Sequence, residues 1–274
     1  MMSSSKSVQV IALTSGKGGV GKTNTAVNMA LALQKAGNRV LLLDADLGLA
    51  NVDVMIGLYA TYNLSHVLSG EKRINEILLD GPGGIQVVPA SSGVKSMAEL
   101  NEQQMGYLIQ AFSELNEEYD YLIIDTAAGI SSGVLSFLQA AHHVVVVVVD
   151  EPSSITDAYA MIKLLRRDYD VNNIWLVSNL VDSSEQGEKL FNKLNGVVER
   201  FLGEGINYLC AVPRDTRLSE ANQRQKAVLE VSPSSKSSKA YQRAAAMVSR
   251  WPKPNAARGQ MEFFVERLIE RASA

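Results

Sequence analysis

Short apolar runs alternate along the chain with longer segments in which apolar residues recur at helical spacing. The runs have strand length and are apolar at consecutive positions, as in strands that are buried on both faces of a parallel sheet. The unbroken valines from Val144 to Val149 indicate a central strand of that sheet. Together the runs predict strands at Val8–Thr14, Arg39–Leu43, Ile85–Val88, Tyr121–Asp125, His143–Val149, Ile174–Asn179 and Ile206–Ala211.

The segments with helical spacing lie mostly between these strands, which indicates an α/β fold: a twisted, mostly parallel sheet of about seven or eight strands with helices on both faces. Pro252 and Pro254 interrupt helical spacing near the end. We therefore expect one domain over residues 1–250, a linker at 251–259 and an amphipathic helix within 260–274. The predicted helices are Lys22–Ala36, Asn101–Glu117, Ser131–Ala140, Ser154–Asp168, Ser184–Leu202, Asp215–Arg224, Lys239–Arg250 and Gln260–Arg271.

Composition narrows the function classes. The chain has 26 lysines and arginines against 29 acids, a net charge of −3, so charge gives no argument for sequence-independent binding of nucleic acid. Cys210 is the single cysteine, which excludes an internal disulfide and argues against a metal cluster. The longest aliphatic run is far shorter than the roughly 20 residues of a membrane helix. We expect a cytoplasmic protein.

A phosphate-binding loop follows the first predicted strand. The segment Gly16-Lys-Gly-Gly-Val-Gly-Lys-Thr23 matches GxxxxGKS/T and opens a predicted helix, which is the context that this motif requires. Gly16, Gly18, Gly19, Val20 and Gly21 would turn backbone N–H groups toward phosphate oxygens. In the same motif Lys22 reaches the β- and γ-phosphates and Thr23 binds Mg²⁺. With Asn24 included, this segment predicts binding of ATP and Mg²⁺.

Carboxylates follow two further strands. Tyr121-Leu-Ile-Ile-Asp125 is an apolar strand that ends in an acid, as a Walker B strand does, so Asp125 would hold Mg²⁺ directly or through water. Asp44 and Asp46 follow the second predicted strand and emerge beside the phosphate loop. Open α/β sheets bind ligands at this carboxyl edge, which places all three acids in the predicted site.

The loop contains a second lysine, Lys17, and therefore resembles the deviant Walker A motif of the MinD/ParA class of P-loop ATPases. In that class the extra lysine crosses to the phosphates held by a partner subunit, so the resemblance implies an ATP-bound homodimer in which Lys17 is catalytic together with Lys22. A cation delivered from another chain would stabilise transition-state charge as an arginine finger does. The alternative is that Lys17 is an ordinary solvated lysine.

The same resemblance implies roles for other residues. Asp46 would orient or activate the attacking water, and Asp44 would support the magnesium shell. Asp125, Thr126 and Gly129 would form a switch that senses the γ-phosphate. Many relatives have proline where Ala127 stands, so the switch here would be stiffened differently.

Recognition of the base is also implied by resemblance. Asn179 matches the adenine-binding asparagine of the class, whose amide both donates and accepts hydrogen bonds. Pro213, Arg214 and Asp215 resemble the loop that covers the adenine. Glu151 resembles a residue that contacts the ribose of the partner's nucleotide. Each of these could instead be an ordinary polar residue at a strand end.

Four segments, DADLGLANVD, DTAAGI, DEPSSITDAYAMIKLL and EFFVERLIE, resemble the FleN/FlhG branch of the class, the MinD-like regulators of flagellar number. The resemblance implies an antiactivator whose ATP-bound dimer binds a σ54-dependent flagellar activator of the FleQ or FlrA type and is reset by slow hydrolysis. Two alternatives remain: a membrane-associated positioning ATPase like MinD, and a DNA-segregation ATPase of the ParA type, which the net charge disfavours.

The last predicted helix separates the partner classes. An apolar stripe runs along it, formed by Met261, Phe264, Val265, Leu268 and Ile269. Basic residues would help such a helix to bind anionic lipid. The acidic residues Glu262, Glu266 and Glu270 outnumber Arg267 and Arg271. We therefore expect docking of this helix on the protein's own surface or on a partner to be at least as favourable as transient membrane contact through 260–271. We expect the protein to be cytoplasmic, and the alternative is a peripheral location at the cell pole or membrane.

Overall fold

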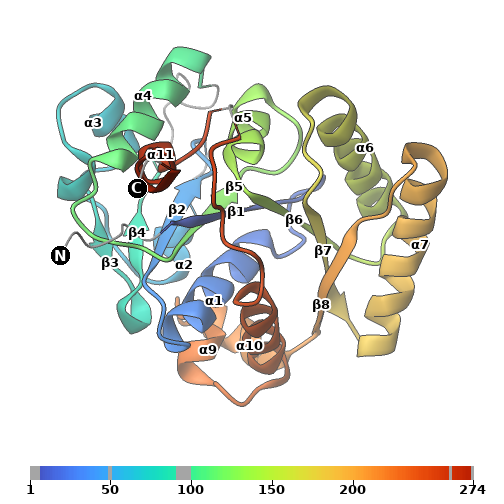
Figure 1. The fold of residues 1–274 in the computed structure, drawn as a ribbon. Helices are drawn as coiled ribbons and strands as arrows, with labels where there is room; N and C mark the ends of the chain where they lie inside the picture. The colour runs from blue at the N-terminus through green and yellow to red at the C-terminus, as the bar shows by residue number, and fades with distance from the viewer. Residues whose placement is uncertain (1–6, 49–50, 91–99, 259–260, 273–274) are drawn as a thin grey trace.

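The computed structural model describes residues 7–48, 51–90, 100–258 and 261–272. Its centre is one eight-stranded sheet with the strand order β3-β4-β2-β5-β1-β6-β7-β8 (Figure 1). All neighbouring strands are parallel except β3 and β4, which are antiparallel. The strands are β1 (Gln9–Thr14), β2 (Val40–Ala45), β3 (Leu79–Asp80), β4 (Gln86–Val88), β5 (Tyr121–Thr126), β6 (His143–Val148), β7 (Ile174–Val181) and β8 (Asn207–Pro213).

Helices cover both faces of the sheet. In Figure 1, α1, α9 and α10 lie on one face, and α4, α5, α6 and α11 lie on the other. The helices are α1 (Lys22–Lys35), α2 (Val52–Met55), α3 (Leu64–Leu68), α4 (Glu102–Ser113), α5 (Ser132–Ala140), α6 (Pro152–Tyr169), α7 (Ser184–Leu202), α8 (Thr216–Gln223), α9 (Val228–Val231), α10 (Lys236–Val248) and α11 (Val265–Ala272), with short 3₁₀ turns η1 (Ile74–Glu76) and η2 (Pro82–Gly84).

The α/β fold predicted from the sequence is confirmed, and so are its seven strands, to within two residues at either end. The sequence pattern missed β3 and the short helices α2, α3 and α9. These elements have between two and five residues, too few to show a period of their own. Helix α11 begins at Val265, whereas the pattern predicted a start at Gln260, which lies outside the described residues.

The core explains why the apolar runs are continuous. Strands β1, β2, β5 and β6 are buried along their full length because each is flanked by strands on both edges and by helices on both faces. Alternate side chains of each strand therefore enter two separate apolar clusters, one on each face. The parallel register places Asp44 opposite Asp125 at the carboxyl ends of β2 and β5.

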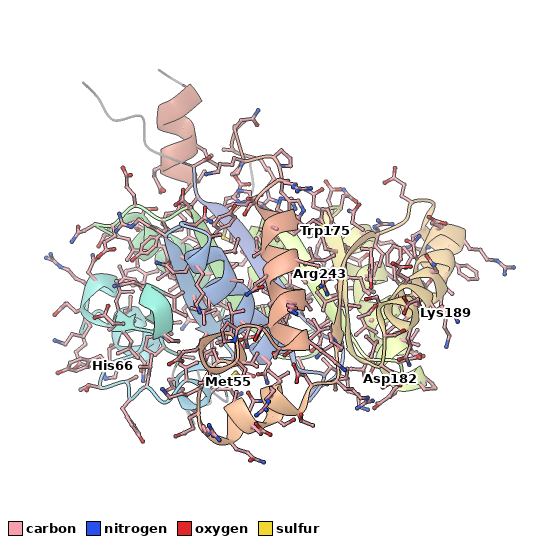
Figure 2. All side chains as sticks on the ribbon, turned by 90° about the horizontal axis from the view of Figure 1, so that it is seen from below. Met55, His66, Trp175, Asp182, Lys189 and Arg243 are labelled. Atoms are coloured by element: carbon pink, nitrogen blue, oxygen red, sulfur yellow. The ribbon has the colours of Figure 1, made fainter. Side chains whose placement is uncertain are left out.

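The segment predicted as a linker, 251–259, is irregular but anchored where the structure describes it. Trp251 is buried and its ring lies 4.3 Å from those of both His143 and Trp175. Arg258 donates to the carbonyl of Ala141 at 3.0 Å and forms an ion pair with Glu262. Figure 2 shows Trp175 near one end of α10 and Met55 beyond the other end. Trp175 lies at the amino end of β7, whereas the phosphate loop follows the carboxyl end of β1, so the aromatic stack and the loop lie at opposite ends of the strands.

The last helix and the turn before it pack against the rest of the protein. Phe263 and Phe264 are buried, and their rings lie 5.0 and 6.2 Å from that of Phe112 in α4. Leu268 is also buried, whereas Ile269 is 55% exposed. Residues 259, 260, 273 and 274 of the predicted tail lie outside the described residues. Within the described part of the chain, no helix has both the length and the apolar content needed to span a bilayer.

Candidate functional site

The phosphate loop connects β1 to α1 and depends on its glycines. Gly19 and Gly21 have φ angles of 80° and 87°, in the left-handed region that side chains disfavour. Gly16 is packed so tightly against α6 that an added Cβ would lie 2.5 Å from Cβ of Asp157. The loop therefore lies close to its neighbours on one side and presents its backbone to a cavity on the other.

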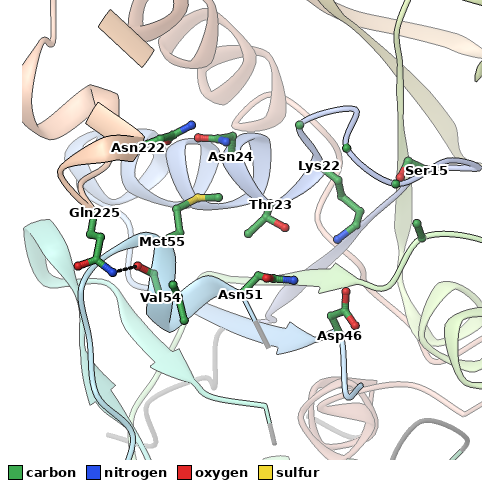
Figure 3. A pocket seen from close by; sticks show the side chains of 14 residues that line it. Ser15, Lys22, Thr23, Asn24, Asp46, Asn51, Val54, Met55, Asn222 and Gln225 are labelled. Carbon is green, nitrogen blue, oxygen red and sulfur yellow. Dashed lines mark hydrogen bonds between the residues drawn. The ribbon is translucent and has the colours of Figure 1, made fainter. Parts of the chain in front are cut away.

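That cavity has a volume of about 660 Å³ and lies at the N-terminus of α1 (Figure 3). The loop and helix α1 form one wall, and the segments after β2 and β5 contribute Asp46 and Ala128. Its far end is closed by α2 and α8. The lining residues are Ser15, Gly18, Gly19, Gly21, Lys22, Thr23, Asn24, Asp46, Asn51, Val54, Met55, Ala128, Asn222 and Gln225.

Lys22 extends from the first turn of α1 to the carboxyl end of β5, where its Nζ lies 2.7 Å from Oδ1 of Asp125. Both side chains are buried, with exposed fractions of 8% and 1%. Burial raises the pKa of the Asp125 carboxyl, and the adjacent ammonium group of Lys22 opposes that rise. The structure thus joins the lysine of the P-loop to the acid of the predicted Walker B strand.

Asp44 lies beneath this pair rather than on the cavity wall. Its carboxylate accepts hydrogen bonds from the backbone N–H groups of Asp46, Asn51 and Val52 at 3.0, 2.9 and 3.0 Å. Burial, followed by repulsion from Asp125, raises its pKa to about 7, although the three hydrogen bonds act in the opposite direction. Asp44 therefore fixes the turn that aims Asp46 at the cavity.

The residues at the loop fit a magnesium ion. Thr23 lines the cavity, and Oδ2 of Asp125 is buried with no hydrogen-bond partner among the described residues. Hydroxyl and carboxylate oxygens of this kind are the ligands that Mg²⁺ takes beside a nucleotide. Thr23 and Asp125 would hold the ion, and Asp44 on β2 is paired with Asp125 on the neighbouring strand β5.

Lys17 is not among the residues that line the cavity. Its Nζ lies 3.0 Å from Oε2 of Glu151 and donates to Oγ of Ser153 at 3.3 Å. The pair is exposed, with fractions of 44% and 58% for the two charged side chains, so water screens it strongly. Lys17 and Glu151, both predicted to contact a partner's nucleotide, thus meet at the protein surface.

Two residues of the predicted switch form hydrogen bonds within the chain. The N–H of Gly129 donates to the carbonyl of Ser15 at 2.9 Å, and Thr126 Oγ1 donates to the carbonyl of Leu13 at the same distance. These contacts tie the segment after β5 to the strand that leads into the phosphate loop. The Gly129 amide would have to leave Ser15 in order to reach a γ-phosphate.

The residues predicted to bind the base do not line the cavity. Asn179 is buried behind the loop and donates through Nδ2 to the carbonyl of Val20 at 2.6 Å. Pro213 ends β8, and the exposed side chain of Arg214 lies 3.6 Å from Asp182. Asp215 caps α8 and accepts from the N–H and Oγ of Ser237 at 2.9 and 2.7 Å.

Sequence reasoning missed the far wall of the cavity. Asn51, Val54 and Met55 lie on or next to α2, and Asn222 and Gln225 lie on or just after α8. The two helices are joined because Gln225 Nε2 donates to the carbonyl of Val54 at 3.1 Å. No motif links segments this far apart in sequence, so only the folded chain shows that they share a cavity with the P-loop.

This arrangement defines a P-loop NTPase: a glycine loop opens a helix, and its lysine meets a buried acid at the carboxyl edge of a parallel sheet. A family model described as ParA, the NUBPL iron-transfer P-loop NTPases, matches residues 6–249. The chain belongs to this family, and more narrowly to its MinD/ParA class of ATPases, which bind ATP with Mg²⁺. The one cysteine, Cys210, is buried.

Individual relatives narrow the class further. The chain is 51% identical over 269 residues to the antiactivator FleN of Pseudomonas aeruginosa, a match that covers 98% of this chain and 96% of that protein. It is 34% identical to the flagellum site-determining protein YlxH of Helicobacter pylori, over 81% of this chain and 76% of that one. The MinD cell division protein of Aquifex aeolicus superimposes with a TM-score of 0.73 at 26% identity, covering 90% of this chain and 99% of that one.

Proposed function

We propose that this ATPase regulates flagellar number as an antiactivator. The observation that carries the proposal is the 51% identity to FleN over 98% of the chain. A match of that length includes the phosphate loop, the acids after β2 and β5, and the C-terminal helix together. The match to a flagellum site-determining protein supports the same biological setting.

The proposed cycle uses ATP as a switch for association. ATP and Mg²⁺ close a homodimer across the phosphate loops, the closed dimer binds a σ54-dependent flagellar activator of the FleQ or FlrA type, and slow hydrolysis releases it. The exposure of Lys17 supports this cycle, because a surface lysine held by a screened ion pair is available to a second subunit. In the dimer Lys17 would leave Glu151 for the partner's phosphates.

Within one subunit the residues of the site would have different roles. Bound Mg²⁺ would neutralise phosphate charge. Lys22 would stabilise the β- and γ-phosphates, and the backbone of Gly18, Gly19 and Gly21 would hold their oxygens. Asp46, on the cavity wall beside Lys22, would orient the attacking water (Figure 3). Asp44 would keep Asp46 in place through the turn that it caps.

We propose that the protein acts in the cytoplasm and that its tail does not anchor it to a membrane in the state described here. The observation behind this choice is the burial of Phe263, Phe264 and Leu268 against the protein itself. Apolar side chains that are already covered contribute little to lipid binding. The membrane-positioning alternative requires that ATP or a partner first release this helix.

A nucleotide-dependent pull-down tests the proposal. The immobilised protein should retain a purified σ54-dependent flagellar activator in ATP and Mg²⁺ but not in ADP. The Lys22→Ala variant should not retain it in either nucleotide, whereas Lys163→Ala, which changes an exposed lysine of α6, should behave like wild type. Retention that is the same with ATP, with ADP and without nucleotide would contradict the switch.

A further inference from the structure

Helix α10 and the segment after it carry positive charge only. From Val231 to Met261 the sequence has six basic residues and no aspartate or glutamate. Because the whole chain has a net charge of −3, the rest of it carries −9. The two parts of the chain are therefore opposite in charge, which the nearly neutral total conceals.

Four of these basic residues lie on the outer surface of α10. Lys236, Lys239 and Arg243 belong to the helix and Arg250 to the turn after it, and all four side chains are exposed. We call these four residues the basic stripe. The opposite face of α10 packs against α1 and β8. Figure 2, which views the molecule from the side of α10, shows Arg243 on this helix. Among the described residues, no acid lies within salt-bridge distance of any of the four.

Helix stability does not explain the basic stripe. Lys236 is the first residue of α10, where the helix dipole favours acids, and the first turn holds no acid. Lys239 follows Lys236 by three residues and precedes Arg243 by four, spacings at which like charges repel. Helix α7 has the stabilising arrangement, with Glu185 in its first turn and Arg200 in its last. A charge pattern that weakens its own helix points to a role in binding an anion.

The spacing of the basic stripe fits a helical partner. Positions 236, 239, 243, 246 and 250 are separated by alternating steps of three and four residues, the spacing at which one helix contacts another along its length. Ala246, between the cations, has a small side chain that allows a close approach. Met247 beside it is 40% exposed, and methionine and arginine are enriched in the contact surfaces of protein complexes.

Other anionic ligands fit this surface less well. Duplex DNA is bound through many phosphate contacts, whereas the stripe has four cations and the charge of −9 on the rest of the chain repels a polyanion. Single strands stack on exposed aromatic rings, but Tyr241 and Trp251 are buried. Lipid requires a broad apolar face, and within α10, which the structure describes completely, Met247 is the one large apolar side chain that is exposed.

We infer that the basic stripe is a docking surface for an acidic helix of the protein partner. The inference rests on the proposed function, in which that partner is the σ54-dependent activator, and adds the place and the chemistry of the contact. Carboxylates of the partner helix would pair with the four cations. The stripe begins at the carboxyl edge of the sheet, because Ser237 donates to Asp215, which caps α8 just after β8. A partner seated there would lie near the nucleotide.

Charge reversal within the stripe tests the inference in the full chain. Lys239→Glu should lower retention of the activator in ATP and Mg²⁺ about tenfold, because an anion would then face the acidic helix. ATP affinity should not change, and the urea midpoint should stay or rise, because the introduced acid attracts Lys236 and Arg243. Lys189→Glu, which changes an exposed lysine of α7, is the matched control and should retain the activator like wild type (Figure 2).

Titration with poly-L-glutamate tests the chemistry of the surface without the activator. Wild type should bind this polymer, and raising the salt from about 0.1 M to about 1 M should weaken the binding, because the Debye length falls from about 10 Å to about 3 Å. Lys239→Glu should weaken the binding as well, whereas Lys189→Glu should leave it unchanged.

The other outcomes are distinguishable. Activator retention and poly-L-glutamate binding that are the same in wild type and Lys239→Glu would overturn the inference. Binding of duplex DNA or of anionic vesicles that Lys239→Glu abolishes, with activator retention intact, would assign the stripe to that ligand instead. If wild type bound poly-L-glutamate through Lys239 but did not retain the activator, the proposed function would be wrong while the acidic-helix surface would stand.

Discussion

Lys22 and Asp125 are 103 residues apart in sequence, yet they form a buried ion pair with 2.7 Å between Nζ and Oδ1. Removing one partner of such a pair leaves a buried charge uncompensated, which costs far more than the loss of a surface pair. The pair therefore links the integrity of the fold to the chemistry of the phosphate site.

The two lysines of the loop should respond differently to mutation. Lys22→Ala should weaken ATP binding by about 100-fold or more, because charge-assisted hydrogen bonds to phosphate are lost. Lys17→Ala should retain most ATP affinity and lose ATP-dependent dimerisation or hydrolysis, because Lys17 lies at the surface. Titration calorimetry and light scattering measure the two properties.

Thermal unfolding is the control for the Lys22 variant, because the unpaired Asp125 could destabilise the fold. A folded Lys22→Ala protein with wild-type ATP affinity would show that the loop does not bind phosphate as proposed.

Asp46→Ala should separate binding from turnover. The side chain lines the cavity but is not part of the phosphate loop, so ATP binding should persist while phosphate release slows by about 100-fold, a typical effect of losing a catalytic base. An ATP-bound dimer should then accumulate in light scattering. Asp53→Ala, in helix α2, is the matched control, and equal turnover in the two variants would exclude a special role for Asp46.

Much of this molecule could be predicted from local sequence. The strands β1, β5 and β6 are continuous apolar runs, because both of their faces are buried, and the phosphate loop is contiguous in sequence. The far wall of the cavity could not be predicted in this way. Asn222 and Met55 meet there only because α8 packs beside α2, and nothing within either segment specifies the other.

Asp215 shows a second limit. Resemblance implies a nucleotide contact, which stays a prediction, and the structure shows its carboxylate capping α8 and accepting a hydrogen bond from Ser237. A helix cap and a ligand contact use the same residue types at the same strand-to-helix turn, so sequence alone does not separate them. For the C-terminal tail, the apolar stripe was evident in the sequence, but its contact was not. Only the packing of the folded chain showed that Phe112 covers part of the stripe.

The paired histidines should make stability depend on pH. Burial lowers the pKa of His142 to about 4, and burial together with His142 and Arg258 lowers that of His143 to about 4. The folded state then binds fewer protons than the unfolded state between pH 6.5 and 4, so stability present at neutral pH is lost as the pH falls through this window. At pH 5 the lowered pKa of each histidine should reduce the free energy of unfolding by about 2 kcal/mol.

Urea unfolding at pH 7 and pH 5 checks this expectation. His142→Gln and His143→Gln should each show a smaller loss between the two pH values than wild type. The geometry supports the sign, because Nδ1 of His142 accepts from the N–H of Val10 at 2.9 Å and so requires an unprotonated nitrogen. Identical losses in wild type and both variants would contradict it.

The docked tail predicts weak membrane binding. Full-length protein without ATP should not co-sediment with anionic vesicles, because Phe263, Phe264 and Leu268 are covered. A truncation after Arg258 should behave the same way and serves as the control. Sedimentation that requires ATP and is lost on truncation would favour the positioning alternative over the antiactivator.

The stack of Trp251 on Trp175 has an optical consequence. These are the protein's 2 tryptophans, and their ring centroids are 4.3 Å apart, so all of the indole emission comes from one place. That place is the point where the chain leaves α10 for its C-terminal segment, and neither indole lines the cavity beside the phosphate loop. Intrinsic fluorescence of the unlabelled protein therefore reports whether this segment stays attached, and a spectral change on adding ATP would be a signal relayed across the sheet.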